Sequence, residues 1–117
     1  MSKDEDFLQA YKNIAFSLQS ISVSQESLVL NYKGGQSHHN SFNEIKKAAI
    51  ITTDEGPFVD DVFWLLVLES IVMIPQGIEG EDQLLPRLQQ LPGFHNELVI
   101  KAMSSVGNDS FEVWSRD

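Results

Sequence analysis

Residues Gly56 to Gln76 decide the fold of this 117-residue chain, and they read GPFVDDVFWLLVLESIVMIPQ. The stretch holds the longest apolar run of the sequence, residues 62–68, and a second run, residues 71–74, with Glu69-Ser70 between them. Two apolar runs of strand length around a short polar break are typical of a β-hairpin. Both alternating faces of residues 62–68 are apolar, which is typical of an interior strand covered on both sides. The sequence therefore predicts a hairpin at the centre of a sheet.

Upstream of this hairpin, the sequence predicts one helix and two strands. Residues 6–18 place apolar side chains at helical spacing, so we expect an amphipathic helix docked on the sheet. Residues 21–23 and 28–32 alternate apolar and polar side chains, which predicts two strands joined around Gln25-Glu26. The pair Gly34-Gly35 then predicts a turn, because glycine adopts positive φ without steric cost.

The segment between this turn and the hairpin is harder to assign. Residues 37–41 are polar and fit either a loop or an edge strand. The β-branched cluster Ile50-Ile51-Thr52-Thr53 predicts a strand, which the breaker residues of segment 54–57 end.

Downstream of the hairpin, the pattern changes to helical. Leucines at 84, 85, 88 and 91 predict an amphipathic helix opened by Glu81 or Asp82. Asn96 is expected to cap a second helix with an apolar stripe of Val99, Ile100 and Met103, and Gly107 to end it. Phe111, Val113 and Trp114 then predict either a last short strand or an extended tail laid over the core.

We therefore predict a single α+β domain over residues 1–117, with an antiparallel meander sheet of about five strands and helices packed against it. The predicted core comprises Phe63, Trp64, Leu65, Leu66, Ile74, Leu85, Leu88, Val99 and Met103.

Composition narrows the classes of partner. The net charge of −9 argues against nucleic acid and anionic membranes, whose affinity for proteins depends largely on Lys and Arg, but it permits a basic protein partner. The chain holds no cysteine, which excludes disulfides, thiolate nucleophiles and Cys-based metal sites. The acidic start, with no apolar run of signal-peptide type, favours a cytoplasmic setting.

The acidic and histidine side chains form no recognisable metal motif. Asp54, Glu55, Asp60 and Asp61 lack the ligand spacing of an EF-hand loop, and we interpret them as a solvated turn followed by the start of a strand. His38, His39 and His95 lack the spacing of a zinc site and are expected on surface loops. No metal and no cofactor are predicted.

Catalytic motifs are likewise missing, so the sequence predicts a protein that is not an enzyme. No serine lies in a nucleophile motif, and neither Gly34-Gly35 nor the glycines at 77 and 80 have the context of a phosphate-binding loop. The loop 75–80 places Ile78 between two glycines, where it fits either a contact with a partner or a side chain tucked under the following helix.

Several motifs together resemble a set of small bacterial proteins whose activity is not established. They are Gly56-Pro57-Phe58 with Asp61-x-Phe63-Trp64, Ile74-Pro75-Gln76 with Gly80-Glu81, Leu88-Gln89-x-Leu91-Pro92-Gly93-Phe94, Ala102-Met103 and Phe111-x-x-Trp114. The resemblance covers residues 42–114 and implies a bacterial source. The strand order up to Gln76, followed by a helix, is also similar to bacterial pleckstrin-homology-like domains. That resemblance implies, as an alternative fold, a bent sheet capped by a C-terminal helix.

Three classes of function remain, and the first ranks highest. It is a non-enzymatic domain that binds a basic protein, in one form an inhibitor or immunity factor. The second is a small-ligand-binding regulatory domain, which needs a pocket of convergent polar groups beside the sheet that contains Trp64. The third is an enzyme. For the first class, the predicted partner contacts are Asp54, Glu55, Asp60, Ile78 and Glu79.

Overall fold

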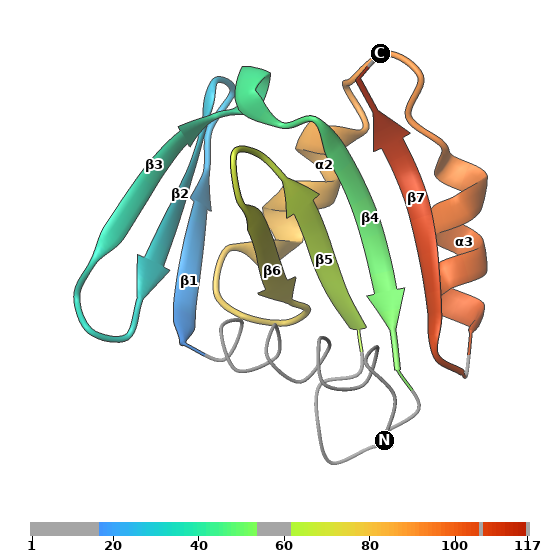
Figure 1. Ribbon diagram of the computed structural model, residues 1–117, viewed down its shortest axis with the longest axis horizontal. Coiled ribbons are helices and arrows are strands. Elements are labelled where there is room, and N and C mark those ends of the chain that lie inside the picture. Colours follow the sequence, from blue (N-terminus) through green and yellow to red (C-terminus); the bar gives the residue numbers. More distant parts are fainter. Residues whose placement is uncertain (1–16, 54–61, 106, 117) are drawn as a thin grey trace.

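The computed structural model describes residues 17–53, 62–105 and 107–116. These residues form an α+β structure with seven strands in two antiparallel sheets, one of three strands and one of four. Figure 1 shows the two sheets side by side, with the helices behind the larger one. The predicted α+β class is confirmed. Of the helix predicted over residues 6–18, residues 6–16 lie outside the described part of the chain.

The first sheet is a meander of β1 (Leu18–Val23), β2 (Ser27–Tyr32) and β3 (Ser37–Ser41). The two strands and both turns predicted for this segment are confirmed, and Gly35 occupies the second turn with φ of +89°. The polar segment 37–41 is the edge strand rather than a loop. It needs no apolar face, because its first three residues are exposed and its last two are only half-buried.

A short 3₁₀ turn, η1 (Phe42–Glu44), carries the chain from the first sheet to the second. Its capping box is complete, since the backbone N–H of Asn43 donates to Ser41 Oγ and that of Ser41 donates to Glu44 Oε1, each at 3.1 Å. Phe42 is 1% exposed and anchors the turn in the core. The strands are thus divided between two sheets at η1, where the sequence predicted one sheet of about five.

The second sheet contains β4 (Lys47–Thr52), β5 (Val62–Val67), β6 (Ile71–Pro75) and β7 (Asp109–Ser115) in the order β6-β5-β4-β7. β5 and β6 form the predicted hairpin, and β5 is interior because β4 pairs with its other side. The strand predicted over residues 111–114 is β7, which pairs with β4. A strand therefore follows the last helix, which departs from the pleckstrin-homology-like alternative.

The two faces of β5 contact two apolar clusters, as its sequence predicts. Trp64 and Leu66 belong to the main core, which the first sheet, the second sheet and the helices enclose together. Phe63 lies on the opposite face, where it forms a smaller cluster with Met73 and the partly buried Leu65.

The helical region begins with η2 (Glu81–Gln83), followed by α2 (Leu84–Leu88) and α3 (Asn96–Ser104). Leu84 and Leu88 are fully buried, and Pro86 lies in the first turn of α2, where a missing N–H costs little. The predicted caps are wrong. Neither Glu81 nor Asp82 makes a side-chain capping bond, and the N-cap of α3 is His95 rather than Asn96.

The end and the buried face of α3 also differ from prediction. The helix stops at Ser104, and Gly107 instead accepts a hydrogen bond from Thr52 Oγ1 at 2.8 Å through its carbonyl. Val99 and Ala102 face the core, whereas Met103, predicted as a core residue, is 49% exposed. No helix in the described ranges is long and apolar enough to cross a membrane.

Candidate functional site

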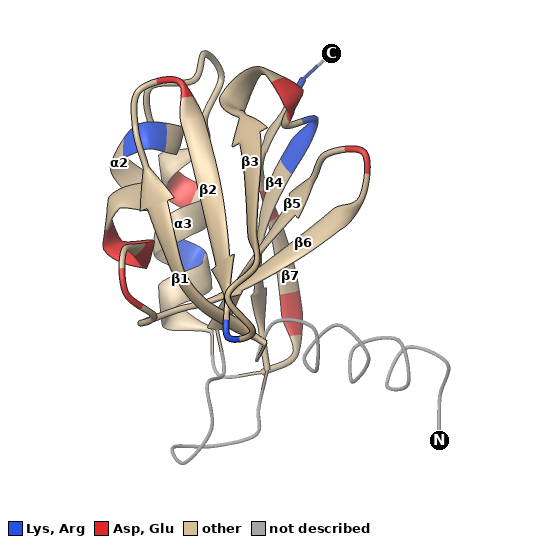
Figure 2. Cartoon of the chain, turned by 90° about the vertical axis from the view of Figure 1, so that its left-hand side faces the viewer, with Lys and Arg blue, Asp and Glu red and all other residues tan. Residues whose placement is uncertain are grey.

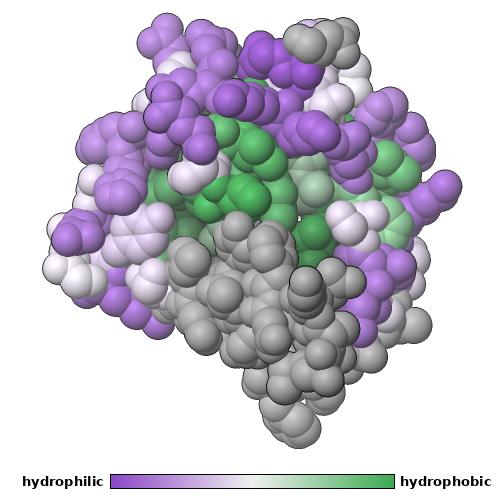
Figure 3. Space-filling view, viewed as in Figure 1, coloured by the Kyte–Doolittle hydropathy of each residue, from purple (hydrophilic) through white to green (hydrophobic). Residues whose placement is uncertain are grey.

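A groove of about 290 Å³ lies between the first sheet and the β5–β6 hairpin. Leu30, Tyr32, His38 and Asn40 on β2 and β3 form one wall. The opposite wall consists of Leu68, the turn Glu69-Ser70 and the first three residues of β6, and Glu44 of η1 completes the lining. Figure 3 shows apolar side chains gathered in the centre of this face of the molecule, between polar rims.

Strand pairing places the polar residues of β3 inside this groove. Leu30 pairs with His38, and Leu28 pairs with Asn40, so each polar side chain shares a face with a buried leucine. The ring of His38 meets the ring of Tyr32 edge-on, with centroids 5.2 Å apart. His39 points to the opposite face, so adjacent histidines diverge, as they must in a strand.

The charged side chains among the residues that line the groove are carboxylates, Glu44 and Glu69. Neither Lys nor Arg is present in this described lining. Burial raises the pKa of Tyr32 above its ordinary value of 10.0. At neutral pH the groove therefore offers a phenol O–H, imidazole and amide groups, and negative charge, which suits a ligand that carries a cation.

The other acidic residues do not gather on one surface of the described structure. Figure 2 shows the Asp and Glu positions, in red, scattered over separate turns, strands and helices. Many of the acidic residues lie outside the described ranges: Asp4, Glu5, Asp6, Asp54, Glu55, Asp60, Asp61 and Asp117. Three predicted partner contacts, Asp54, Glu55 and Asp60, are among them.

The loop 75–80, which contains the predicted contacts Ile78 and Glu79, forms a backbone hydrogen bond with the first sheet. The backbone N–H of Ile21 on β1 donates to the carbonyl of Glu79 at 2.9 Å. Ile78 is partly buried and packs against the main core, in agreement with the tucked-in alternative, while the Glu79 side chain is exposed. Neither residue lines the groove.

One buried polar group was missed by sequence reasoning. The Glu81 carboxylate accepts from Trp64 Nε1 at 2.8 Å and from the backbone N–H of Gly77 at 3.0 Å. With 9% of its surface exposed, this carboxylate is an internal acceptor rather than a helix cap. The available signal was the core tryptophan, since a buried indole N–H usually finds an acceptor.

The described ranges contain no group of three or more His, Asp or Glu side chains that could hold a metal ion. His95 Nδ1 lies 3.2 Å from Glu97 Oε1 on the first turn of α3, away from the groove residues. The pKa of Glu97 is lowered by a hydrogen bond from its own backbone N–H and by the contact with His95. The interaction between His95 and Glu97 is therefore confined to the start of α3.

Comparisons with protein-family models, with curated proteins and with solved structures found no match to this chain. The function of the chain is therefore inferred from the groove itself.

Proposed function

We propose that this chain is a non-enzymatic protein-interaction domain of a bacterial cytoplasm, and that it binds an extended basic segment of another protein in the groove between β3 and β6. The observation that carries this proposal is the charge of the lining. Its ionised side chains in the described structure are Glu44 and Glu69, and the whole chain has a net charge of −9. A field of one sign steers an oppositely charged partner toward the site.

The volume of the groove lies at the lower end of the range for small-molecule sites. Ligand pockets for drug-sized molecules usually span about 300–1,000 Å³, and this groove holds about 290 Å³. A groove of that volume also accommodates a few side chains of a protein segment.

A small-ligand-binding regulatory domain is the second candidate, because several polar groups converge on one place. The Tyr32 phenol, the His38 ring and the Asn40 amide all line the same wall. Such a ligand would be small and cationic. Binding of a small organic amine, with no binding of a basic peptide, would favour this candidate.

The absence of catalysis is also part of the proposal. The sequence contains no recognisable nucleophile, metal or cofactor motif, which motivates this part of the proposal.

A peptide-binding experiment tests the proposal. The probes are two fluorescein-labelled heptapeptides, one of alternating Lys and Val and one of alternating Glu and Val, followed by fluorescence anisotropy at low and moderate salt. We expect the Lys-Val peptide to bind, to weaken as salt rises, and to bind more tightly than the Glu-Val peptide. Failure of the Lys-Val peptide to bind would refute the proposed function.

Two double variants locate the binding site. Glu44→Gln with Glu69→Gln removes two groove charges and keeps the capping bond of η1, because glutamine also serves in a capping box. This double variant should lose two exposed ion pairs with lysines of the peptide, each worth about 0.2–1 kcal/mol. The affinity for the Lys-Val peptide should therefore fall about 2- to 30-fold. The matched control, Glu26→Gln with Glu79→Gln, changes the net charge equally outside the lining and should bind like the wild type. Equal losses in both double variants would place binding elsewhere.

A further inference from the structure

We infer that the groove has two chemically different ends, and that it selects a partner segment with an aromatic residue and a basic residue on the same face; this inference rests on the proposed function. The acidic end of the groove holds the carboxylates of Glu44 and Glu69. The aromatic end holds the rings of Tyr32 and His38. A partner segment that offers positive charge alone would use only one of these ends.

The acidic end lies where η1 meets the β5–β6 turn. Glu44 Oε1 accepts from the N–H of Ser41 at 3.1 Å, which holds this carboxylate beside the end of β3. Glu69 follows the end of β5, where the carbonyl of Val67 accepts from the N–H of Lys46 at 2.7 Å, close to η1. Both carboxylates therefore belong to the same end of the groove. The side chain of Lys46 does not belong to the described lining.

The aromatic end lies toward the turn that joins β2 to β3. The N–H of Tyr32 donates to the carbonyl of Gln36 at 2.8 Å across this turn. His38 pairs with Leu30, two residues before Tyr32, and the two rings are 5.2 Å apart. Figure 1 shows the β2–β3 turn at the bottom of the first sheet, whereas the β5–β6 turn lies toward the top. The rings and the carboxylates are therefore at opposite ends of the groove.

The two ends are far enough apart to receive separate side chains. Ser27 of β2 pairs with Ser41, the residue beside the Glu44 carboxylate. Tyr32 lies five residues further along β2, which corresponds to about 16 Å at a strand rise of about 3.3 Å per residue. Because the lining side chains extend into the groove from both ends, the gap between them is shorter than this. Residues i and i+4 of an extended segment, which share one face and lie about 13 Å apart, match such a gap.

The aromatic end favours a ring over a cation. The rings of Tyr32 and His38 are inclined at 61°, so they form a corner rather than a parallel stack. A third ring can pack edge-to-face against such a corner, which is an arrangement that aromatic pairs prefer. The facing wall of the groove adds the half-buried apolar side chains of Ile71 and Val72. The carboxylates that would stabilise a cation belong to the other end.

The side chains of both ends are accessible to a partner. His38, Glu44 and Glu69 are exposed, and Tyr32 is partly exposed. Within the described residues, neither carboxylate forms an ion pair. A basic side chain of the partner therefore displaces no internal cation from the acidic end. The contacts that we assign to the partner use these side chains and no buried backbone group.

Two pairs of peptides test this inference, and the members of each pair have the same composition and charge. In the first pair, Phe-Val-Lys-Val-Lys-Val-Lys places the ring on the face of the lysines, and Val-Phe-Lys-Val-Lys-Val-Lys places it on the opposite face. The second pair, Lys-Val-Lys-Val-Lys-Val-Phe and Lys-Val-Lys-Val-Lys-Phe-Val, covers the other chain direction.

We expect the same-face member of at least one pair to bind about 2- to 12-fold more tightly than its partner, which is the range for one aromatic contact. If neither pair differs while the Lys-Val peptide binds, the two-ended groove is wrong and the proposed function stands. Absence of any Lys-Val peptide binding would instead refute the proposed function.

The adjacent histidines of β3 supply matched protein variants. His38→Leu removes a ring from the groove, whereas His39→Leu removes one from the opposite face, and both positions are exposed. We expect His38→Leu to reduce the preference for the same-face peptide about twofold or more, and His39→Leu to leave it unchanged. An unchanged preference in His38→Leu, or equal reductions in both variants, would overturn the inference.

The charge variants test whether the two ends act separately. Glu44→Gln with Glu69→Gln should weaken both members of a peptide pair by the same factor, because well-separated contacts contribute additively. The preference for the same-face peptide should therefore persist in this double variant. Its loss would show that the ring and the basic residue share one site, which overturns the two-ended groove.

Nuclear Overhauser effects in the wild-type protein give a direct readout. With the same-face peptide at saturation, we expect contacts between the phenylalanine ring of the peptide and the ring protons of Tyr32. Absence of these contacts would overturn the inference even if the peptides differ in affinity. A dimer in sedimentation that the same peptide dissociates would overturn it in favour of a second copy of this chain.

Discussion

The indole of Trp64 donates a hydrogen bond to the buried carboxylate of Glu81, with 2.8 Å between Nε1 and Oε2. The bond joins the interior strand β5 to the turn that precedes α2. The second oxygen of Glu81 accepts from the N–H of Gly77 at 3.0 Å, so one side chain fixes the course of the loop between β6 and the helices. This loop is in turn bonded to β1 through Glu79. Glu81 therefore connects elements of both sheets.

Replacing Glu81 should be costly for stability. Glu81→Ala leaves the buried Trp64 indole without its acceptor, and an unsatisfied buried donor costs about 1–3 kcal/mol. The amide of Gly77, an exposed residue, loses the same acceptor but can bind water instead. Glu81→Gln keeps one acceptor oxygen and should lose about half as much. Urea unfolding followed by tryptophan fluorescence measures both changes. Asp82→Ala, at an exposed neighbouring position, is the control and should change the free energy of unfolding by less than about 0.5 kcal/mol.

Gly80 should be irreplaceable. Its φ of +88° is unfavourable for any L side chain, and a Cβ there would collide with the backbone carbonyl of Ile21. We expect Gly80→Ala to destabilise the fold by about 3 kcal/mol or more, or to prevent folding, because both strain and overlap oppose it. Gly35→Ala is the matched control, since Gly35 has φ of +89° in open space. It should cost only the conformational strain of about 1–2 kcal/mol. Equal unfolding midpoints for the two variants would contradict the overlap.

The fold was predictable where a pattern is local. Apolar residues on both faces of segment 62–68 specify an interior strand, and the structure places β4 and β6 on its two sides. The division into two sheets was not predictable, because it depends on the capping box of Ser41 and Glu44 and on the burial of Phe42. A prediction based on apolar residues alone also assigns the wrong buried face to α3. The small Ala102 points inward, while the larger Met103 lies outside.

The candidate site was not predictable for a different reason. Its residues come from β2, β3, η1 and the β5–β6 hairpin, and no short motif joins them. The segment that holds His38 and Asn40 fitted either a loop or an edge strand, because its polar residues show no apolar alternation. Asp54, Glu55 and Asp60 were predicted as partner contacts because these acidic residues lie close together in the sequence. They lie outside the described ranges, so their role stays a prediction.

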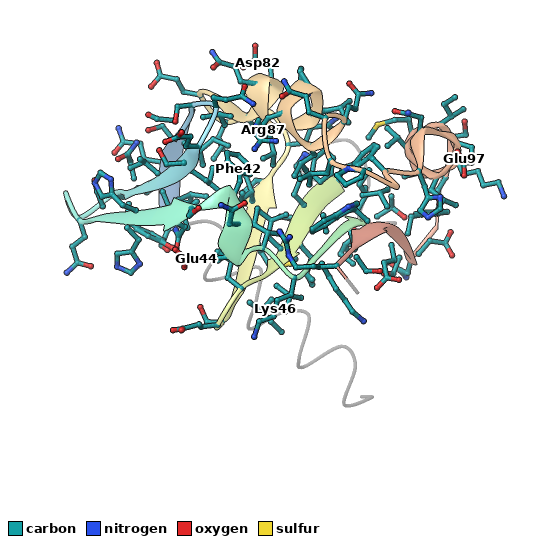
Figure 4. All side chains as sticks on the ribbon, turned by 90° about the horizontal axis from the view of Figure 1, so that it is seen from above. Phe42, Glu44, Lys46, Asp82, Arg87 and Glu97 are labelled. Carbon is teal, nitrogen blue, oxygen red and sulfur yellow. The ribbon has the colours of Figure 1, made fainter. Side chains whose placement is uncertain are left out.

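Arg87 should stabilise the junction between α2 and η1. Figure 4 shows it beside Phe42, where its guanidinium carbon lies 4.4 Å from the ring centroid. Its Nε also donates to the carbonyl of Gln25 at 2.7 Å. A double-mutant cycle of Arg87→Met and Phe42→Leu, measured by urea unfolding, should give a coupling free energy of about 0.5–1 kcal/mol. Strictly additive effects would show that the stacked geometry contributes nothing.

Tyr32 should make stability depend on alkaline pH. Burial raises the pKa of this phenol in the folded protein above 10.0, its ordinary value, which applies to the unfolded chain. As pH rises above 10.0, the unfolded state loses this proton before the folded state does. The free energy of unfolding therefore falls across the window between the two pKa values, whereas the contribution of Tyr32 is complete below it. Tyr32→Phe removes this component and leaves the other titrating groups unchanged. Urea unfolding of both proteins below and above pH 10.0 should show the wild type losing more stability than the variant. Parallel pH profiles would mean that the phenol is equally solvated in the folded and unfolded states.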